Sequence, residues 1–231
     1  MKENPDLISH AEGVWSLEFP LRFMGLNLGR RATLLAISEK RLVIHSTGPF
    51  TAGHRRRMEQ LGRPEILLDA TTMHDTFACK ARAVFSDVAY FAPERFPVKA
   101  RGPTARAFSD LESSTAGEIQ TVRLDGMRFF EEYACFHPVS RTLIVCDLLF
   151  NLDRARGYTR WAMRHLLGVK EWPAMDRPVR MAVKDRDAFT ASIKQILEWD
   201  FDRVIVAHGS VIEKNGKDQF RDAMLRAGFS L

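Results

Sequence analysis

Two apolar runs in the second half of the chain constrain the fold most strongly. Residues 140–151 (SRTLIVCDLLFN) and residues 202–209 (DRVIVAHG) are rich in β-branched side chains, and each reaches one residue able to bind a metal, Asp147 and His208. Short apolar runs of this composition predict buried strands. A strand that carries a carboxylate or an imidazole at its end fixes that group in a cleft. The sequence therefore predicts a metal or acid–base site built on strand ends.

The rest of the chain alternates predicted strands and helices. Further strands are expected at residues 14–21, 31–38, 41–46, 64–70, 88–92, 120–124 and 128–133. Helices are expected at residues 51–61, 77–85, 154–167, 184–198 and 218–227. Residues 93–118 are rich in proline, glycine and serine, which predicts a long connection with at most one short helix and leaves open whether it covers a cleft. This order predicts a single α/β or α+β domain over residues 1–231, with helices outside the sheets.

Composition and charge limit the classes of partner. An apolar fraction of 45% over 231 residues is typical of a globular protein with a full core. The net charge of +5 is mildly basic, and the only dense cationic cluster runs from His54 to Arg57, where a solvated helix face is expected. Because no basic patch with interleaved aromatic residues is present, we expect a small-molecule substrate rather than a nucleic acid.

The cysteines and the N-terminal residues indicate the compartment. Cys79, Cys135 and Cys146 form no CxxC pair, and their odd number argues against a disulfide framework. Cys79 and Cys146 lie in apolar runs and are predicted to be buried. Residues 1–10 have no apolar signal region, and no apolar stretch reaches the roughly 18–20 residues that span a bilayer. These features predict a cytoplasmic protein without a membrane segment.

Three stretches together resemble a known fold family. They are RATLLAISEKRLVIHSTGPFT, DATTMHDTFACKARAVFSDVAYFAPE and EYACFHPVSRTLIVCDLLFN, and VIVAHG extends the likeness to residue 209. The chain resembles an uncharacterised group within the metallo-β-lactamase fold superfamily. The resemblance implies an αββα sandwich, two mixed sheets with helices on both outer faces, and a cleft at one edge where loops carry metal ligands.

The resemblance also implies which residues bind metal. Asp147 matches the superfamily's bridging aspartate, and His208 matches its last metal histidine. The first ligand cluster, normally HxHxDH, corresponds to residues 69–75, where only His74 and Asp75 have ligand chemistry and stand in reversed order. The stretch that corresponds to the middle histidine, residues 124–127, contains no histidine. The resemblance therefore implies a degenerate motif with at most one metal.

Each candidate also has a structural interpretation. Asp147 could be a helix cap or a buried hydrogen-bond acceptor, and His208 could bond a backbone carbonyl beside a turn. His74 and Asp75 could belong to a loop in which Asp75 caps the next helix. His45 is expected to be structural or to support a ligand, and His137 to lie in a hairpin turn. His165 is expected to contact Trp161 on one helix face.

Three hypotheses follow. In the first, His74, Asp147 and His208 bind one Zn, Fe or Mn ion, Asp147 and Asp75 assist catalysis, and the protein hydrolyses a small ester, thioester, amide or phosphoester. In the second, the site is vestigial, no metal binds, and the protein is a binding or structural member of the fold. A third hypothesis, nucleic-acid processing, rests only on the basic charge and on the resemblance, since some relatives of this fold cut RNA. The sequence leaves the oligomeric state open.

Overall fold

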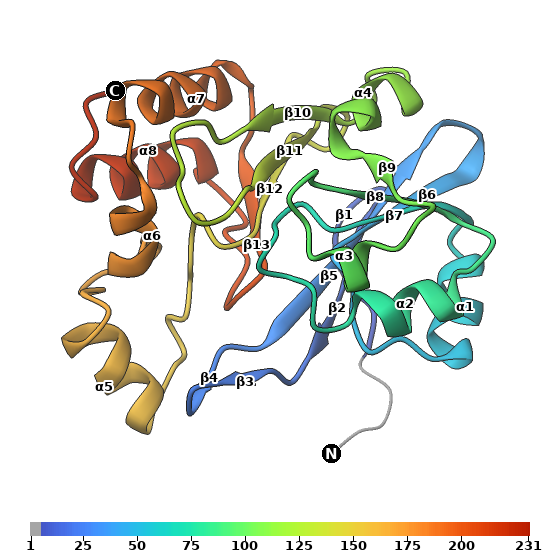
Figure 1. Ribbon diagram of the computed structural model, residues 1–231, viewed down its shortest axis with the longest axis horizontal. Coiled ribbons are helices and arrows are strands. Elements are labelled where there is room, and N and C mark those ends of the chain that lie inside the picture. The colour runs from blue at the N-terminus through green and yellow to red at the C-terminus, as the bar shows by residue number, and fades with distance from the viewer. Residues whose placement is uncertain (1–5) are drawn as a thin grey trace.

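Two β-sheets face each other at the centre of the protein (Figure 1). The computed structural model describes residues 6–231. Residues 1–5, half of the N-terminal stretch in which no apolar signal region was found, lie outside the described residues. The first sheet has the order β1-β2-β5-β6-β7-β8-β9 and the second has the order β10-β11-β12-β13. A short hairpin, β3 (Arg22–Phe23) with β4 (Leu26–Asn27), projects from the first sheet.

Both sheets are mixed. The strands of the first are β1 (Ile8–Ala11), β2 (Val14–Phe19), β5 (Arg30–Ile37), β6 (Arg41–His45), β7 (Arg63–Leu68), β8 (Ala89–Ala92) and β9 (Arg106–Ala107). Those of the second are β10 (Gln120–Arg123), β11 (Tyr133–His137), β12 (Thr142–Val145) and β13 (Arg203–Val206). Strands β6 to β9 run parallel, as do β12 and β13, and the other neighbours are antiparallel.

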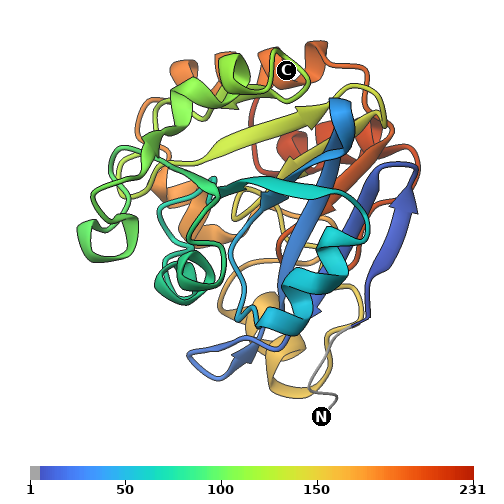
Figure 2. The same ribbon diagram turned by 90° about the vertical axis from the view of Figure 1, so that its right-hand side faces the viewer.

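Helices cover the outer faces of both sheets, as the two views show (Figure 2). Their bounds are α1 (Ala52–Glu59), α2 (Ala78–Val84), α3 (Val98–Arg101), α4 (Leu111–Ser114), α5 (Gly157–His165), α6 (Arg177–Ala182), α7 (Arg186–Glu198) and α8 (Gly216–Arg226), with 3-10 turns η1 (Ser38–Lys40) and η2 (Phe108–Asp110). One apolar cluster packs α1 and α2 on the first sheet, and another packs α6, α7 and α8 on the second. The predicted αββα sandwich is therefore confirmed.

The core between the sheets explains why the strands form here. Leu35, Val43 and Leu68 of the first sheet pack in one buried cluster with Ile144 and Ile205 of the second. Each residue is at most 2% exposed. Since side chains alternate along a strand, a sheet packed on both faces needs the nearly continuous apolar runs that the sequence supplies.

Several local predictions were wrong. Residues 128–132 form a loop, and β11 begins at Tyr133, because the backbone of this segment bonds the loop after β7: the N–H of Thr72 donates to the carbonyl oxygen of Glu131. Residues 93–118 contain α3, β9, η2 and α4, more than the single helix expected. The sequence reasoning also missed α6, although Asp176 caps it and a proline stands in its first turn. His137 lies in the last position of β11, buried and paired with Thr142, and the turn begins after it.

Candidate metal centre

Strand register brings Asp147 and His208 together. Strands β12 and β13 are parallel, and Val145 pairs with Val206. Asp147 and His208 therefore each lie two residues beyond a paired position, at the same edge of the second sheet. His74 comes from the loop after β7 of the first sheet. Thr71 of that loop forms a bridge with Glu132, which joins the loop to the second sheet.

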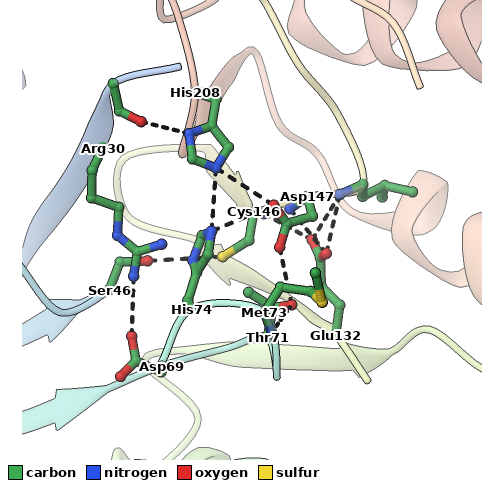
Figure 3. Close-up of polar contacts among 12 residues, drawn as sticks. Arg30, Ser46, Asp69, Thr71, Met73, His74, Glu132, Cys146, Asp147 and His208 are labelled. Carbon is green, nitrogen blue, oxygen red and sulfur yellow. Dashed lines mark hydrogen bonds and ion pairs between the residues drawn. The ribbon is translucent and has the colours of Figure 1, made fainter. Parts of the chain in front are cut away.

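The three side chains converge closely (Figure 3). Nε2 of His74 lies 3.3 Å from Nε2 of His208 and 3.4 Å from Oδ1 of Asp147. Nε2 of His208 lies 3.5 Å from the same Oδ1. All three residues are at most 9% exposed. Two imidazoles and one carboxylate thus present three donor atoms to one point.

This triangle fits a divalent ion. A tetrahedral zinc ion bound at about 2.0–2.1 Å keeps its ligand atoms about 3.3–3.4 Å apart. The observed separations of 3.3 to 3.5 Å match that requirement without any movement of the chain. Three protein ligands are also the number at which catalytic zinc sites keep a position for water or substrate.

His208 has the surroundings expected of a metal ligand. Its Nδ1 lies 2.7 Å from the carbonyl oxygen of Gly29 and donates a proton to it, which leaves the Nε2 lone pair directed at the cluster. Phe150 stacks on the imidazole at 11° between the ring planes, with 5.4 Å between centroids. The ring is therefore fixed in tautomer and in orientation.

His74 is held less completely. Its Nδ1 is buried without a hydrogen-bond partner. Burial, reinforced by the positive charge of Arg30, lowers the pKa of His74 to about 3, so the ring is neutral at pH 7. A neutral imidazole is the form that binds metal. Without a partner at Nδ1, however, His74 lacks the supporting contact that strengthens ligand histidines.

Asp147 is oriented from both sides. Thr71 donates its hydroxyl to Oδ2 at 3.2 Å, which leaves Oδ1 facing the two histidines. Burial alone would raise the pKa of Asp147, but His74 and the hydrogen bond to His208 outweigh it and hold this pKa well below its usual value. The carboxyl group is therefore ionised and available as a ligand.

Glu132 fixes the turn that carries Asp147. Its fully buried carboxyl group accepts hydrogen bonds from the backbone N–H groups of Cys146, Asp147 and Leu148, at 2.8 to 3.2 Å. Burial, followed by the charge of Asp147, raises the pKa of Glu132 to about 8. One side chain thus satisfies three successive donors that no strand partner reaches.

A buried ion pair lies beside the cluster. Arg30 donates to Oδ1 of Asp69 at 3.3 Å and to the carbonyl oxygen of Thr47 at 3.0 Å. Asp69 also accepts from the backbone and hydroxyl of Thr47 and from the hydroxyl of Tyr90. Burial lowers the pKa of Arg30 and raises that of Asp69, and the attraction between them opposes both shifts. Asp69 is therefore committed to this network.

The remaining candidates lie outside the triangle. Asp75 follows His74 and is exposed; its backbone carbonyl, not its side chain, bonds the first turn of α2. His45 is buried at the end of β6, where Nδ1 contacts the Ser46 hydroxyl at 3.2 Å and Nε2 has no partner. His165 is exposed and contacts the ring of Trp161, as expected.

The cysteines divide differently from the prediction. Cys146 is buried, and burial raises the pKa of its thiol well above the usual value, which makes it a poor nucleophile. Cys79, predicted to be buried, is exposed. It lies on the outward side of α2, whose buried residues are Ala78 and Ala81. All three cysteines are free thiols.

Sequence reasoning missed the residues that support the ligands. Glu132, Thr71, Arg30 and Asp69 are fully or almost fully buried polar residues. Charged residues are seldom buried unless they are paired. The only signal was the position of Arg30 and Asp69 beside apolar runs predicted as strands. No pattern along the chain could show which partner each would meet.

Comparison with known proteins supports the fold. No protein-family model matches the sequence, and no curated protein does. Among solved structures, a metallo-β-lactamase from Pontibacter korlensis is 12% identical with a TM-score of 0.62, covering 96% of this chain and 98% of that one. The metallo-β-lactamase from Erythrobacter litoralis with β-mercaptoethanol in its active site is 13% identical with a TM-score of 0.67, covering 98% of both chains.

A third similar structure is a one-metal form. The metallo-β-lactamase FIM-1 from Pseudomonas aeruginosa, in its mono-zinc form, is 11% identical with a TM-score of 0.64, covering 97% of this chain and 95% of that one. Identities this low establish architecture and not activity. This chain has the metallo-β-lactamase fold, and a three-residue His/Asp cluster stands at one edge of its sheets. In the described part of the chain, no helix is long and apolar enough to cross a membrane.

Proposed function

We propose that the protein is a metal-dependent hydrolase that uses one divalent ion held by His74, Asp147 and His208. The observation that carries this proposal is the triangle of donor atoms, whose sides of 3.3 to 3.5 Å suit a tetrahedral ion. Zinc, iron and manganese all accept imidazole and carboxylate ligands. The small-molecule substrate would contain an ester, thioester, amide or phosphoester bond.

A bound ion would lower the pKa of a water molecule toward ~7 and polarise a carbonyl or phosphoryl oxygen. The protein supplies the positioning. Gly29 holds the His208 ring through Nδ1, Thr71 holds one oxygen of Asp147, and Glu132 holds the turn beneath it. Asp75, exposed next to His74, could orient the attacking water or accept its proton.

The alternative, a vestigial site in a binding or structural protein, also has an observation in its favour. Without an ion, a proton on Nε2 of His74 can be shared with Asp147 or His208, since both lie within 3.4 Å. Nε2 of His74 then has a hydrogen-bond partner within the cluster, and no ion is needed to provide one. The unpaired Nδ1 of His74 further weakens the case for tight metal binding.

Metal content decides between the two. We expect about one zinc, iron or manganese per chain in protein purified without added metal. Substitution of His74, Asp147 or His208 by alanine should remove it, whereas His165→Ala, a change to an exposed histidine on α5, should not. Metal retained in all three site variants would refute the ligand assignment. Metal-free wild-type protein that is inactive in esterase and phosphodiesterase screens with added Zn²⁺ or Mn²⁺ would favour the vestigial site.

The compartment and the role of Asp75 are part of the proposal. Three free thiols, one of them exposed, suit a reducing cytoplasm. If Asp75 acts on water, Asp75→Asn should lower kcat by roughly 10²–10⁴-fold while metal content stays at the wild-type level. Unchanged kcat would remove Asp75 from the mechanism.

A further inference from the structure

The β3–β4 hairpin and α5 meet at the lower left of Figure 1 and at the bottom of Figure 2. The N–H of Asn27 donates to the hydroxyl of Thr159 at 2.9 Å. A Cβ at Gly25 would stand 3.2 Å from the ring of Tyr158. The hairpin therefore rests directly on the helix, and the two elements present one continuous surface to solvent.

Exposed apolar side chains are concentrated on these two elements. Of the twelve large apolar side chains that are exposed within residues 6–231, four belong to the hairpin and α5, and each is more than 50% exposed. They are Phe23, Met24, Tyr158 and Trp161. Exposed apolar residues that stand singly are ordinary, but a group of them marks a binding surface.

Met24 stands at the tip of the hairpin in a conformation that does not suit methionine. Met24 and Gly25 form a two-residue turn between Phe23 and Leu26, with φ of +48° and +82°. Turns with positive φ at both positions favour asparagine followed by glycine. Because Met24 is 81% exposed, its side chain stabilises neither this turn nor the core, which indicates a role outside the fold.

Helical periodicity divides the outer side of α5 into two rows. The buried residues of α5 are Thr159, Ala162 and Met163. Residues three or four apart lie on the same side of a helix, which places Arg160 and Arg164 together in one exposed row. The neighbouring row is aromatic, and its rings follow one another in contact: Tyr158, Trp161 and His165.

Five exposed arginines give this surface a positive charge. They are Arg22 on the hairpin, Arg154 and Arg156 before α5, and Arg160 and Arg164 within it. Within residues 6–231, none of them forms an ion pair, and residues 21–29 and 154–170 contain no acid. The acids that flank α5 are engaged elsewhere, since Asp153 accepts from the Ser210 hydroxyl and Glu171 pairs with Arg226. A basic patch with aromatic residues is thus present, and its two halves meet only in the folded chain.

The charge suits an anionic partner, and the apolar side chains favour lipid over nucleic acid. Bases bind such surfaces by stacking on free aromatic faces. Trp161 already has Tyr158 at 6.0 Å and His165 at 5.6 Å as ring neighbours, and Met24 offers no ring. Tryptophan and tyrosine prefer the membrane–water interface, and an apolar face beside arginines is typical of interfacial binding.

We propose that this surface docks the protein on anionic lipid membranes. Phe23, Met24 and Trp161 enter the boundary between headgroups and acyl chains, and the arginines contact the anionic headgroups. The bound protein lies on the membrane without crossing it. The surface shares no residue with the metal cluster, so docking does not depend on the proposed hydrolase.

Sedimentation with lipid vesicles tests the proposal on the whole chain. One set of vesicles is phosphatidylcholine alone, and the other contains about one third phosphatidylserine. Wild-type protein should sediment with the second set and remain in solution with the first. Trp161 is the one exposed tryptophan of the four in the chain, so a blue shift of tryptophan emission should accompany binding.

Met24→Asn is the most informative variant, because asparagine suits the turn and should keep or raise the melting temperature. Its affinity for the phosphatidylserine vesicles should fall by about 10- to 100-fold, the effect of removing one inserted methionine. Val139→Asn is the matched control. It changes an exposed apolar residue in the turn between β11 and β12 and should bind as wild type does.

Arg160→Gln with Arg164→Gln tests the charge. Each arginine near an anionic membrane contributes on the order of fivefold, so the double variant should bind about 25-fold more weakly. Arg56→Gln with Lys194→Gln removes the same charge from exposed positions on α1 and α7 and should have little effect.

Equal binding to both kinds of vesicle, wild-type affinity in Met24→Asn, or binding without a blue shift would overturn the proposal. Single-stranded oligothymidine is the probe for the other partner. Oligothymidine binding that weakens in Arg160→Gln with Arg164→Gln, while vesicles stay unbound, would also overturn lipid docking. Metal content should be the same in every variant, so membrane binding can fail while the hydrolase stands, and the reverse.

Discussion

Gly209, the residue after His208, has a backbone conformation and close neighbours that exclude a side chain. Its φ is +100°, and a Cβ there would stand 2.1 Å from the carbonyl oxygen of Asn151. The backbones of these segments are joined by hydrogen bonds from Asn151 to His208 and from Ser210 to Asn151. A side chain at this position therefore cannot be accommodated without moving His208.

Gly209→Ala should lower the free energy of unfolding by about 2–4 kcal/mol and weaken metal binding, because strain and a backbone clash add together. Chemical denaturation and metal titration measure the two effects. Gly117 is the control: its φ is +79°, but a Cβ there would meet nothing within 4 Å, so Gly117→Ala should cost about 1 kcal/mol. Similar losses of unfolding free energy in Gly209→Ala and Gly117→Ala would contradict the close approach of residue 209 to the carbonyl oxygen of Asn151.

Asp176 predicts a pH effect. It caps α6 by accepting from the N–H of Val179 at 2.9 Å, and burial, with a smaller contribution from Asp147, raises its pKa to about 6. A carboxyl group whose pKa is raised on folding is held more firmly protonated in the native state. The native state therefore loses stability as pH rises from about 4, the unfolded pKa, to about 6, and the loss remains at higher pH.

Asp176→Asn keeps the cap and removes the charge. The variant should exceed wild type in stability by about 1–3 kcal/mol at pH 7.5, and this difference should vanish near pH 4. Urea denaturation across pH 4 to 8 measures it. Asp185→Asn, at the exposed cap of α7, should not show this rise. A difference that stays constant with pH would disprove the explanation.

At the scale of elements, the turn after β12 depends on Glu132. Its two carboxyl oxygens receive the N–H groups of three consecutive residues. This arrangement replaces the hydrogen bonds that a continuing strand would have made, and it sets the direction in which Asp147 leaves the sheet.

Glu132→Gln should destabilise the protein by about 1–3 kcal/mol and reduce metal affinity, because the glutamine offers one acceptor oxygen and turns N–H groups toward N–H groups. Denaturation and metal titration provide the measurements. The matched control, Glu171→Gln, alters a glutamate whose side chain is 73% exposed and should have little effect. Wild-type metal affinity in Glu132→Gln would show that Asp147 does not depend on this turn.

Element positions could be anticipated where burial and pattern agree. β5, β6, β12 and β13 are apolar runs buried on both faces. The predicted strands 31–38 and 41–46 differ from β5 and β6 by one residue at most at either end, and β12 and β13 lie within the predicted runs 140–151 and 202–209. The loop before β11 has strand-forming residues but no neighbour for them, since its backbone bonds the loop after β7 instead. Local strand propensity cannot show which segment the backbone of this loop will bond.

At the scale of the whole molecule, the three ligands join parts that are far apart in sequence. His74 belongs to the first sheet, and Asp147 and His208 belong to the second. The sheets also meet through an apolar core. An ion at the cluster would therefore link both halves of the sandwich, and its binding would stabilise the folded state alone.

Added Zn²⁺ or Mn²⁺ at 100 times its dissociation constant should raise the free energy of unfolding by about 2.7 kcal/mol. Melting curves with metal and with chelator give the shift, which His208→Ala should abolish and His165→Ala should preserve. An identical shift in wild type and His208→Ala would place the metal elsewhere.

The sequence by itself determined the strands and the type of ligand at their ends. Short β-branched runs predict buried strands, and a polar residue such as Asp147 or His208 at the end of such a run needs a partner when it is buried. Only the tertiary structure decided that His74 meets them at 3.3 to 3.4 Å, and that Glu132, Thr71 and Arg30 surround them. Thr71 and Asp147 are 76 positions apart along the chain, and His74 and His208 are 134 apart, whereas Glu132 and Asp147 are 15 apart. Their partners are set by the packing of one sheet on the other, which no local pattern encodes.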